Sequence, residues 1–332
     1  MQTATDLSTL AADGDAAAAS APRIASALDL IGNTPLMELR RVDPPEDRAA
    51  VFAKLEFRNP GGSVKDRLGL GLIRAGEMSG QLKPGGTIIE PTAGNTGIGL
   101  ALVGCQRGYR VILCVPAHFS VEKQKLMEAL GGTVVRTPSE DGMKGAIARA
   151  HELSGEIEDA YVPQQFENDG NPGIHYATTA PELWAQMDGR IDAAVVGVGS
   201  GGTFSGVARF LKDQDPSILC VAVEPNGSIL QGGEPGKHEV EGIGASFIPG
   251  VLATDCMDEV IMVHDDDALD MALRVASSEG LLVGGSSGAC AVAAFAIARR
   301  LGPGKRVVTV FPDGAERYIS QGHLDAERRK TP

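Results

Sequence analysis

Short apolar runs alternate with amphipathic segments along most of the chain. The apolar runs have the length of strands, and many of the segments between them repeat apolar residues at helical spacing. The predicted strands are Thr34–Leu39, Ala50–Glu56, Thr87–Glu90, Arg110–Val115, Thr133–Arg136, Ala193–Val198, Ile218–Val223 and Val307–Phe311. Near-continuous apolar strands that alternate with helices are typical of parallel sheets covered on both faces, so the pattern predicts an α/β fold.

The predicted helices lie between these strands or follow them. They are Ile98–Arg107, Val121–Leu130, Met143–Leu153, Phe204–Leu211, Ala268–Glu279 and Ala289–Arg300. Because the first two strands follow each other closely, they are expected to form a hairpin. The segment Gly94–Gly97 is interpreted as a turn between a strand and a helix.

The length of 332 residues favours two domains. The polar stretch Gln164–Pro172, punctuated by Gly and Pro, is the predicted crossover between two α/β halves. We expect an N-terminal domain at 58–168 and a C-terminal domain formed by 27–57 plus 169–322. The Ala-, Ser- and Asp-rich segment 1–26 is predicted to be a disordered tail, and 323–332 to be a second tail.

Charge, hydropathy and cysteine usage argue against a nucleic-acid-binding, membrane or metal-binding protein. The 30 Lys and Arg residues against 43 Asp and Glu residues give a formal charge of -13, which argues against a nucleic-acid partner. No apolar run reaches the roughly 18 residues that cross a bilayer, so no membrane association is expected. Five scattered cysteines and no His/Cys/Asp/Glu cluster with ligand spacing predict a cytoplasmic protein without a metal site.

The 43 glycines gather in clusters that carry the candidate chemistry. In NPGGSVKDR a Pro-Gly-Gly turn precedes Ser63, a suitable helix cap, which places Lys65 in the first helical turn. A cation there opposes the helix dipole, so the pKa of the amine is expected to be lowered and its neutral form to be a nucleophile. The alternative is an ordinary solvated lysine beside a loop.

Three further clusters stand before predicted helices. PTAGNTG (91–97) would expose backbone N–H groups to a carboxylate or phosphate, and Asn95 could orient a ligand. GVGSGGT (197–203) matches GxGxxG, and Glu224 ends the next strand, so a dinucleotide site competes with a phosphate cradle there. GGSSGA (284–289) could present a serine hydroxyl. Each cluster alone also fits a plain turn or helix cap.

Taken together, the clusters resemble one family. The chain is similar to fold-type II pyridoxal-phosphate enzymes, specifically the cysteine synthase / cystathionine β-synthase family, across about residues 27–320. The matching motifs are KLEFRNPGGSVKDR (Lys54–Arg67), PTAGNTGIGLA (Pro91–Ala101), QQFEN (Gln164–Asn168), GVGSGGTFSGV (Gly197–Val207), EGIGASFIP (Glu241–Pro249) and GGSSGA (Gly284–Ala289). The resemblance implies two domains, each a mostly parallel twisted sheet flanked by helices, with the cofactor in the cleft between them. The dinucleotide interpretation leaves Lys65 and Ser286 without a role.

The resemblance also implies a role for each motif. Lys65 matches the lysine that holds pyridoxal 5'-phosphate as a Schiff base, and Asn95 and Ser286 match the residues at the cofactor's ring hydroxyl and pyridine nitrogen. The phosphate cradle would comprise Gly199, Ser200, Gly201, Gly202 and Thr203. The substrate site would comprise Thr92, Ala93, Gly94, Asn95, Thr96 and Gln165 around the α-carboxylate, with Gly242 and Gly244 in a loop over the entrance.

The implied activity is β-replacement by a cysteine synthase, which converts O-acetyl-L-serine and sulfide to L-cysteine and acetate through an α-aminoacrylate intermediate. Lys65 would remove the α-proton and later return it. A cystathionine β-synthase that uses homocysteine with O-acetylserine or serine is the close alternative. A serine/threonine dehydratase and a non-catalytic dinucleotide-binding protein are more distant ones.

One departure from the family pattern bears on substrates and partners. Ala93 stands where the carboxylate loop of the family usually has Ser. An Ala at this position resembles the bacterial members that accept homocysteine with O-acetylserine. The missing hydroxyl and the acidic charge also argue against docking of the carboxylate tail of serine acetyltransferase. A homodimer is expected.

Overall fold

The computed structural model describes residues 23–44, 46–92 and 94–325. Most of the two predicted tails, and Ala93, therefore lie outside the described residues. Within these ranges no helix is long and apolar enough to cross a membrane. The same ranges contain no group of three or more His, Cys, Asp or Glu side chains that could hold a metal ion.

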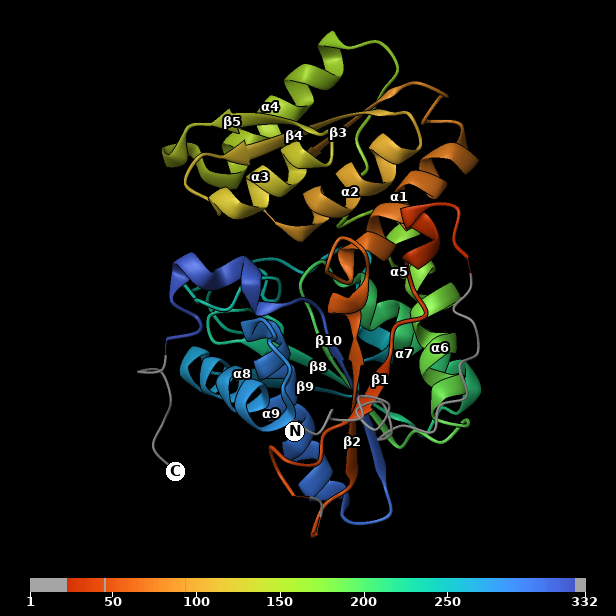
Figure 1. Cartoon of the computed structure of the whole chain (residues 1–332), viewed down its shortest axis with the longest axis vertical. Coiled ribbons are helices and arrows are strands. Elements are labelled where there is room, and N and C mark those ends of the chain that lie inside the picture. Colours follow the sequence, from red (N-terminus) through yellow and green to blue (C-terminus); the bar gives the residue numbers. More distant parts are fainter. Residues whose placement is uncertain (1–22, 45, 93, 326–332) are drawn as a thin grey trace, which may run out of the picture.

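The strands form two separate sheets (Figure 1). In order across the larger sheet, the strands are β1 (Leu36–Glu38), β2 (Ala50–Leu55), β10 (Arg306–Phe311), β7 (Ala193–Gly197), β8 (Leu219–Pro225) and β9 (Glu259–Val263). The smaller sheet consists of β5 (Thr133–Thr137), β4 (Arg110–Pro116), β3 (Thr87–Pro91) and β6 (Ala160–Tyr161). Every pairing is parallel except the predicted hairpin β1–β2, which is antiparallel. The prediction of an α/β fold with mostly parallel sheets flanked by helices is confirmed.

Nine α-helices are present in the described residues (Figure 1). Those of the smaller sheet are α1 (Lys65–Ser79), α2 (Asn95–Gln106), α3 (Val121–Ala129) and α4 (Gly142–Glu156). Those of the larger sheet are α5 (Gly170–Ile174), α6 (Ala180–Gln186), α7 (Gly202–Gln214), α8 (Asp265–Glu279) and α9 (Gly285–Leu301). Short 3-10 segments lie at Ala27–Leu30, Glu56–Arg58, Ser139–Asp141, Thr254–Cys256 and Ala315–Gln321, and a π-helical turn at His175–Thr179.

The inner strands of the larger sheet, β10, β7 and β8, are buried on both faces, as their apolar runs predict. Val195 and Val221 point into the core formed with α8 and α9, whereas Val196 and Ala222 point into the core formed with α6 and α7. Side chains alternate across a strand, so a continuous apolar run supplies two cores at once.

All the predicted strands and helices are present, but four helices begin two or more residues earlier than predicted, among them α8, which begins at Asp265 instead of Ala268. Helix α2 begins at Asn95 instead of Ile98, so the segment Gly94–Gly97 is largely helical rather than a turn. Helices α7 and α9 likewise begin at Gly202 and Gly285. Glycine has a low helix propensity, which hides these first turns in the sequence pattern. Strands β6 and β9 and helices α5 and α6 were not predicted.

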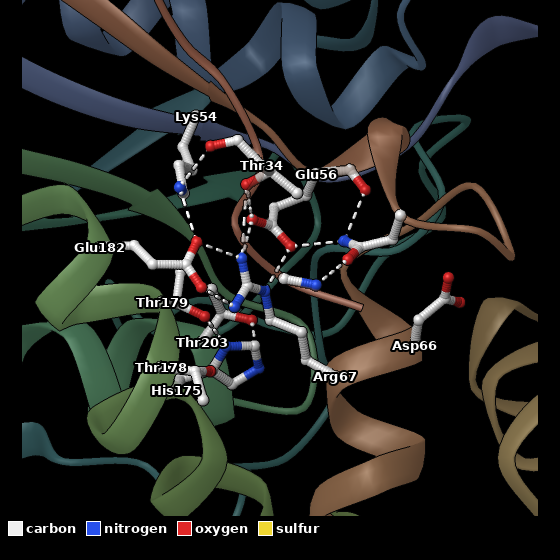
Figure 2. Close-up of polar contacts among 12 residues, drawn as sticks. Thr34, Lys54, Glu56, Asp66, Arg67, His175, Thr178, Thr179, Glu182 and Thr203 are labelled. Atoms are coloured by element: carbon white, nitrogen blue, oxygen red, sulfur yellow. Dashed lines mark hydrogen bonds and ion pairs between the residues drawn. The ribbon is translucent and has the colours of Figure 1, made fainter. Parts of the chain in front are cut away.

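An ion-pair network ties α1 to the larger sheet (Figure 2). The buried Arg67 guanidinium, two residues after Lys65, hydrogen-bonds Glu56 at 2.8 Å and Glu182 of α6 at 2.7 Å. Lys54 of β2 pairs with Glu182 at 2.7 Å. Burial alone raises the pKa of Glu182, but the contacts with Arg67 and Lys54 lower it to about 2. The network therefore holds the N-terminal turn of α1, and with it Lys65, against the larger sheet.

Candidate active site

Two adjoining cavities bring the predicted site residues together. The inner cavity is lined by Lys65, Asn95, Gly199, Ser200, Gly201, Thr203 and Ser286, together with Gly242. The outer cavity, of about 340 Å³, shares Lys65 and Asn95 and is lined by Thr92, Gly94, Thr96, Gln165, Gly242 and Gly244. Of the predicted residues that the structure describes, Gly202 alone lines neither. It begins α7 directly behind the glycine loop and faces Asn171.

Lys65 is the first residue of α1, one residue later than the predicted start. The Ser63 hydroxyl accepts the Lys65 backbone N–H at 3.2 Å, but Val64 is the capping residue. The side chain faces the cavity, and burial of its amine lowers the pKa from 10.5 to about 8, opposed by the carboxylate of Asp313. The direction agrees with the sequence prediction, but the cause here is burial and not the helix dipole.

Sequence reasoning missed an acidic residue that lines the inner cavity, Asp313. Asp313 follows β10 and is buried. Its carboxylate accepts hydrogen bonds from the Asn95 amide at 2.6 Å and from the Tyr318 hydroxyl. Burial raises the pKa of Asp313, while Tyr318 and the other donors lower it. An Asp-Gly pair at the carboxyl end of a predicted strand was the signal that could have revealed it, because ligands gather at this edge of parallel sheets.

The glycine loop brings backbone against backbone. A Cβ on Gly199 would lie 2.2 Å from the carbonyl oxygen of Gly242, so no larger residue fits there. The loop leads into the N-terminus of α7, whose first N–H groups have no partner within the helix. The Ser200 and Thr203 hydroxyls line the same cavity. Amides at a helix N-terminus together with hydroxyls form a site for an anion such as a phosphate.

The outer cavity is lined by the polar side chains of Thr92, Thr96 and Gln165, which suit a substrate carboxylate. Thr96 donates its hydroxyl hydrogen to the side-chain oxygen of Gln165 at 2.8 Å, and both residues are buried. Lys123 pairs with Glu241 in the same cavity, which sequence reasoning had not singled out.

Glu224, the acid of the dinucleotide interpretation, is used elsewhere. Its carboxylate accepts the backbone N–H groups of Leu230 at 2.8 Å and Gln231 at 3.0 Å. The side chain is also 1% exposed and lines neither cavity, so Glu224 is not presented to a ribose.

A family model described as "Pyridoxal-phosphate dependent enzyme" matches residues 27–313. This chain belongs to the pyridoxal-phosphate-dependent enzymes. It is 53% identical over 293 residues to the O-acetylserine dependent cystathionine beta-synthase of Bacillus subtilis, covering 88% of this chain and 95% of that one. It is 51% identical to a cysteine synthase of Staphylococcus aureus, covering 88% and 94%.

Solved structures of similar proteins have the same fold as this chain. The crystal structure of the O-acetylserine dependent cystathionine beta-synthase from Helicobacter pylori superposes with a TM-score of 0.86 at 48% identity. The match covers 90% of this chain and 98% of the other. The enzyme is therefore dependent on pyridoxal phosphate, as the resemblance implied.

The residues of the two cavities fit pyridoxal phosphate chemically. An amine of lowered pKa suits the aldehyde, and the amides and hydroxyls at the start of α7 suit the phosphate. The close contact of Gly199 with Gly242 leaves the loop backbone free of side chains on the ligand side. Ser286, with its neutral hydroxyl, lines the same cavity, and its role at the ring nitrogen stays a prediction.

Attachment of the cofactor to Lys65 is expected to depend on pH with a midpoint near 8, because only the neutral amine attacks an aldehyde. The attachment rate should rise as pH approaches 8 and level off above it. The measurement is the growth of cofactor absorbance after apo-protein is mixed with pyridoxal phosphate, across about pH 6 to 10. Asp313→Asn removes a carboxylate that favours the ammonium form, so its midpoint should fall. A midpoint at the ordinary lysine value would contradict this assignment.

Proposed function

We propose that this enzyme is a cysteine synthase, which exchanges the acetate of O-acetyl-L-serine for sulfide. The observation that carries the proposal is the shared cavity in which the Lys65 amine faces the polar group of Thr92, Thr96 and Gln165. An α-amino acid whose carboxylate binds this group presents its α-carbon to Lys65. The cysteine synthase from Staphylococcus aureus, at 51% identity, supports the same activity.

In this proposal the bound cofactor withdraws electrons from the substrate α-carbon and so makes its proton acidic. Lys65 takes that proton and, after acetate has left the β-carbon and sulfide has bonded there, returns it. Gly199 to Thr203 would hold the phosphate, Asn95 would hold the ring hydroxyl, and Ser286 would offer the ring nitrogen a neutral hydroxyl. The loop with Gly242 and Gly244 lies beside the entrance and limits access of water.

A specific observation favours homocysteine as a second acceptor. The Lys123–Glu241 ion pair lines the outer cavity together with Thr92, Thr96 and Gln165, and Lys123 is buried. Two opposite charges side by side complement the ammonium and carboxylate of an amino acid, whereas sulfide needs neither. The relatives named O-acetylserine dependent cystathionine beta-synthase accord with this second candidate.

The two acceptors are distinguished by product analysis. With O-acetylserine as donor, we expect the holoenzyme to form cysteine with a higher kcat/KM for sulfide than its kcat/KM for homocysteine in forming cystathionine. Products are identified by mass spectrometry, and serine replaces O-acetylserine in the control reaction. A higher kcat/KM for homocysteine would make the second candidate the principal activity. Release of ammonia and a keto acid without any thiol would identify a dehydratase instead.

Four further properties belong to the proposal. The domain boundaries 58–168 and 27–57 plus 169–322 agree with the strand membership of the two sheets, since the chain passes from β6 to α5 between them. We propose a homodimer, a cytoplasmic location and no stable complex with serine acetyltransferase, on the sequence arguments given above.

A further inference from the structure

A buried glutamate at the end of β3 braces a distant loop. Glu90 is 2% exposed and precedes Pro91, the last residue of the strand. Its two carboxylate oxygens accept consecutive backbone N–H groups, from Gln164 at 3.1 Å and from Gln165 at 3.4 Å. Both acceptor atoms of one side chain are therefore used to fix a single corner of the crossover between the two sheets.

This corner has a backbone conformation that needs support. Gln164 has a φ of +54°, in the left-handed region that residues other than glycine seldom adopt. Its conformation directs the next side chain, that of Gln165, to Thr96 in the outer cavity. The Gln165 carbonyl in turn accepts the Asn171 amide at 2.7 Å, which also donates to Ser200 in the glycine loop. The corner thus contacts both the carboxylate-binding group and the phosphate cradle.

The brace is not an ordinary ion pair. Among the described residues, the hydrogen bonds to the Glu90 carboxylate come from these two backbone amides. The ionisable side chains around it are Tyr161 of β6, His151 of α4 and Glu167 of the loop. Burial without a cation raises the pKa of Glu90 to about 7. An ionised carboxylate here is costly for folding, which directs attention to a role in the site.

We propose that Glu90 is a positioning residue for the amino-acid substrate: its carboxylate fixes the Gln164–Gln165 corner and so directs Gln165 and Thr96 at the substrate α-carboxylate. The inference rests on the proposed function in one respect, that the first substrate is an α-amino acid. Glu90 itself contacts neither substrate nor cofactor in this arrangement.

The larger sheet contains a matched control. Glu224 is also buried, also precedes a proline at the end of its strand, and also accepts two consecutive backbone N–H groups. The loop that it braces, at Leu230 and Gln231, lines neither active-site cavity. Glu224→Gln therefore reproduces the structural loss without touching the substrate site.

The test compares Glu90→Gln with Glu224→Gln as holoenzymes. A glutamine can accept only one of the two N–H groups, so the corner is released while shape is kept. In Glu90→Gln we expect the KM for O-acetylserine to rise about tenfold, because about one hydrogen bond to the substrate is lost. The Kd for O-acetylserine, from titration of the cofactor absorbance, should rise by the same factor. The kcat and the KM for sulfide should stay within about twofold. Glu224→Gln should leave the donor KM unchanged.

A pH titration of the wild-type enzyme tests the same point without a variant. As pH falls below about 7, where Glu90 takes up a proton, the O-acetylserine Kd should rise more steeply in the wild type than in Glu90→Gln, in which only the substrate amine titrates. The folded pKa lies above the usual 4.5, so ionisation of Glu90 costs stability as pH rises towards 7. Relative to the wild type, Glu90→Gln should therefore lose less stability at about pH 8 than at about pH 5.

The outcomes separate the two proposals. If the wild-type cofactor spectrum does not respond to O-acetylserine, the proposed function fails. The positioning role is wrong if the wild type responds and Glu90→Gln binds the donor equally well. It is also wrong if Glu90→Gln has a lower kcat and a KM that is raised equally for both substrates. If Glu90→Gln does not fold, a wild-type donor Kd whose pH dependence from about pH 6 to 8 is fully explained by the substrate amine overturns the inference.

Discussion

Replacement of Lys65 by alanine is expected to lower kcat by at least about 10³-fold, or about 4 kcal/mol, and to remove the absorbance of lysine-bound pyridoxal phosphate. Alanine at this position has no amine to hold the cofactor and no base to move the α-proton. The side chain lies at the start of α1, outside the cores, so the fold should be retained. Steady-state assays and the visible spectrum of the purified variant provide the measurement.

The control for Lys65 is an exposed lysine. Lys83 has a side chain that is 63% exposed and pairs with Asp159 at the surface, away from both cavities. Lys83→Ala should therefore keep both spectrum and turnover. A Lys65→Ala protein that retained the wild-type absorbance band and turnover would show that another group carries the chemistry.

Gly199→Ala is expected to weaken pyridoxal phosphate binding by at least about 100-fold, or about 3 kcal/mol. The added Cβ would lie 2.2 Å from the Gly242 carbonyl oxygen. Relief of that overlap requires the glycine loop and the entrance loop to separate. Because both are backbone, no side-chain rotation removes the clash. Equilibrium dialysis or fluorescence titration of the apo-protein with the cofactor measures the loss.

Gly233→Ala is the matched control for Gly199→Ala. A Cβ on Gly233 would meet its nearest atom, the Ser228 carbonyl oxygen, at 3.8 Å, an ordinary contact. The Gly233 variant should bind the cofactor as the wild type does. Equal affinity in the Gly199 variant would mean that the loop has room to move and that the phosphate cradle lies elsewhere.

The sequence predicted the strands well because both faces of the larger sheet are apolar. Residues such as Val195 and Val196 are both buried, so burial appears as an unbroken apolar run. Helix starts were predicted less well, since α2, α7 and α9 begin with glycines or small polar residues that carry no helical pattern. Asn95, Thr203 and Ser286 in these first turns line the cavities, so the helix starts that are hardest to predict belong to the site.

The site residues that went unrecognised share a physical cause. Asp313 and Glu90 act through contacts with residues far away in sequence, Asn95 and Gln165 respectively. Neither acid belongs to a pattern of its own, and only the parallel strand order brings each to its partner. Lys65 and the glycine loop could be predicted because the residues that define each motif are adjacent in the sequence.

The pairing of β2 with β10 also governs how this chain can be synthesised. Ala50 at one end of the sequence pairs with Arg306 near the other, and β10 lies between β2 and β7 in the larger sheet. On the ribosome the strands of the smaller sheet are complete long before β10 emerges, and until then β2 and β7 each present an unpaired edge. A nascent chain stalled before residue 306 is thus exposed to aggregation or chaperone capture at these edges, and loss of the last strand also removes Asp313.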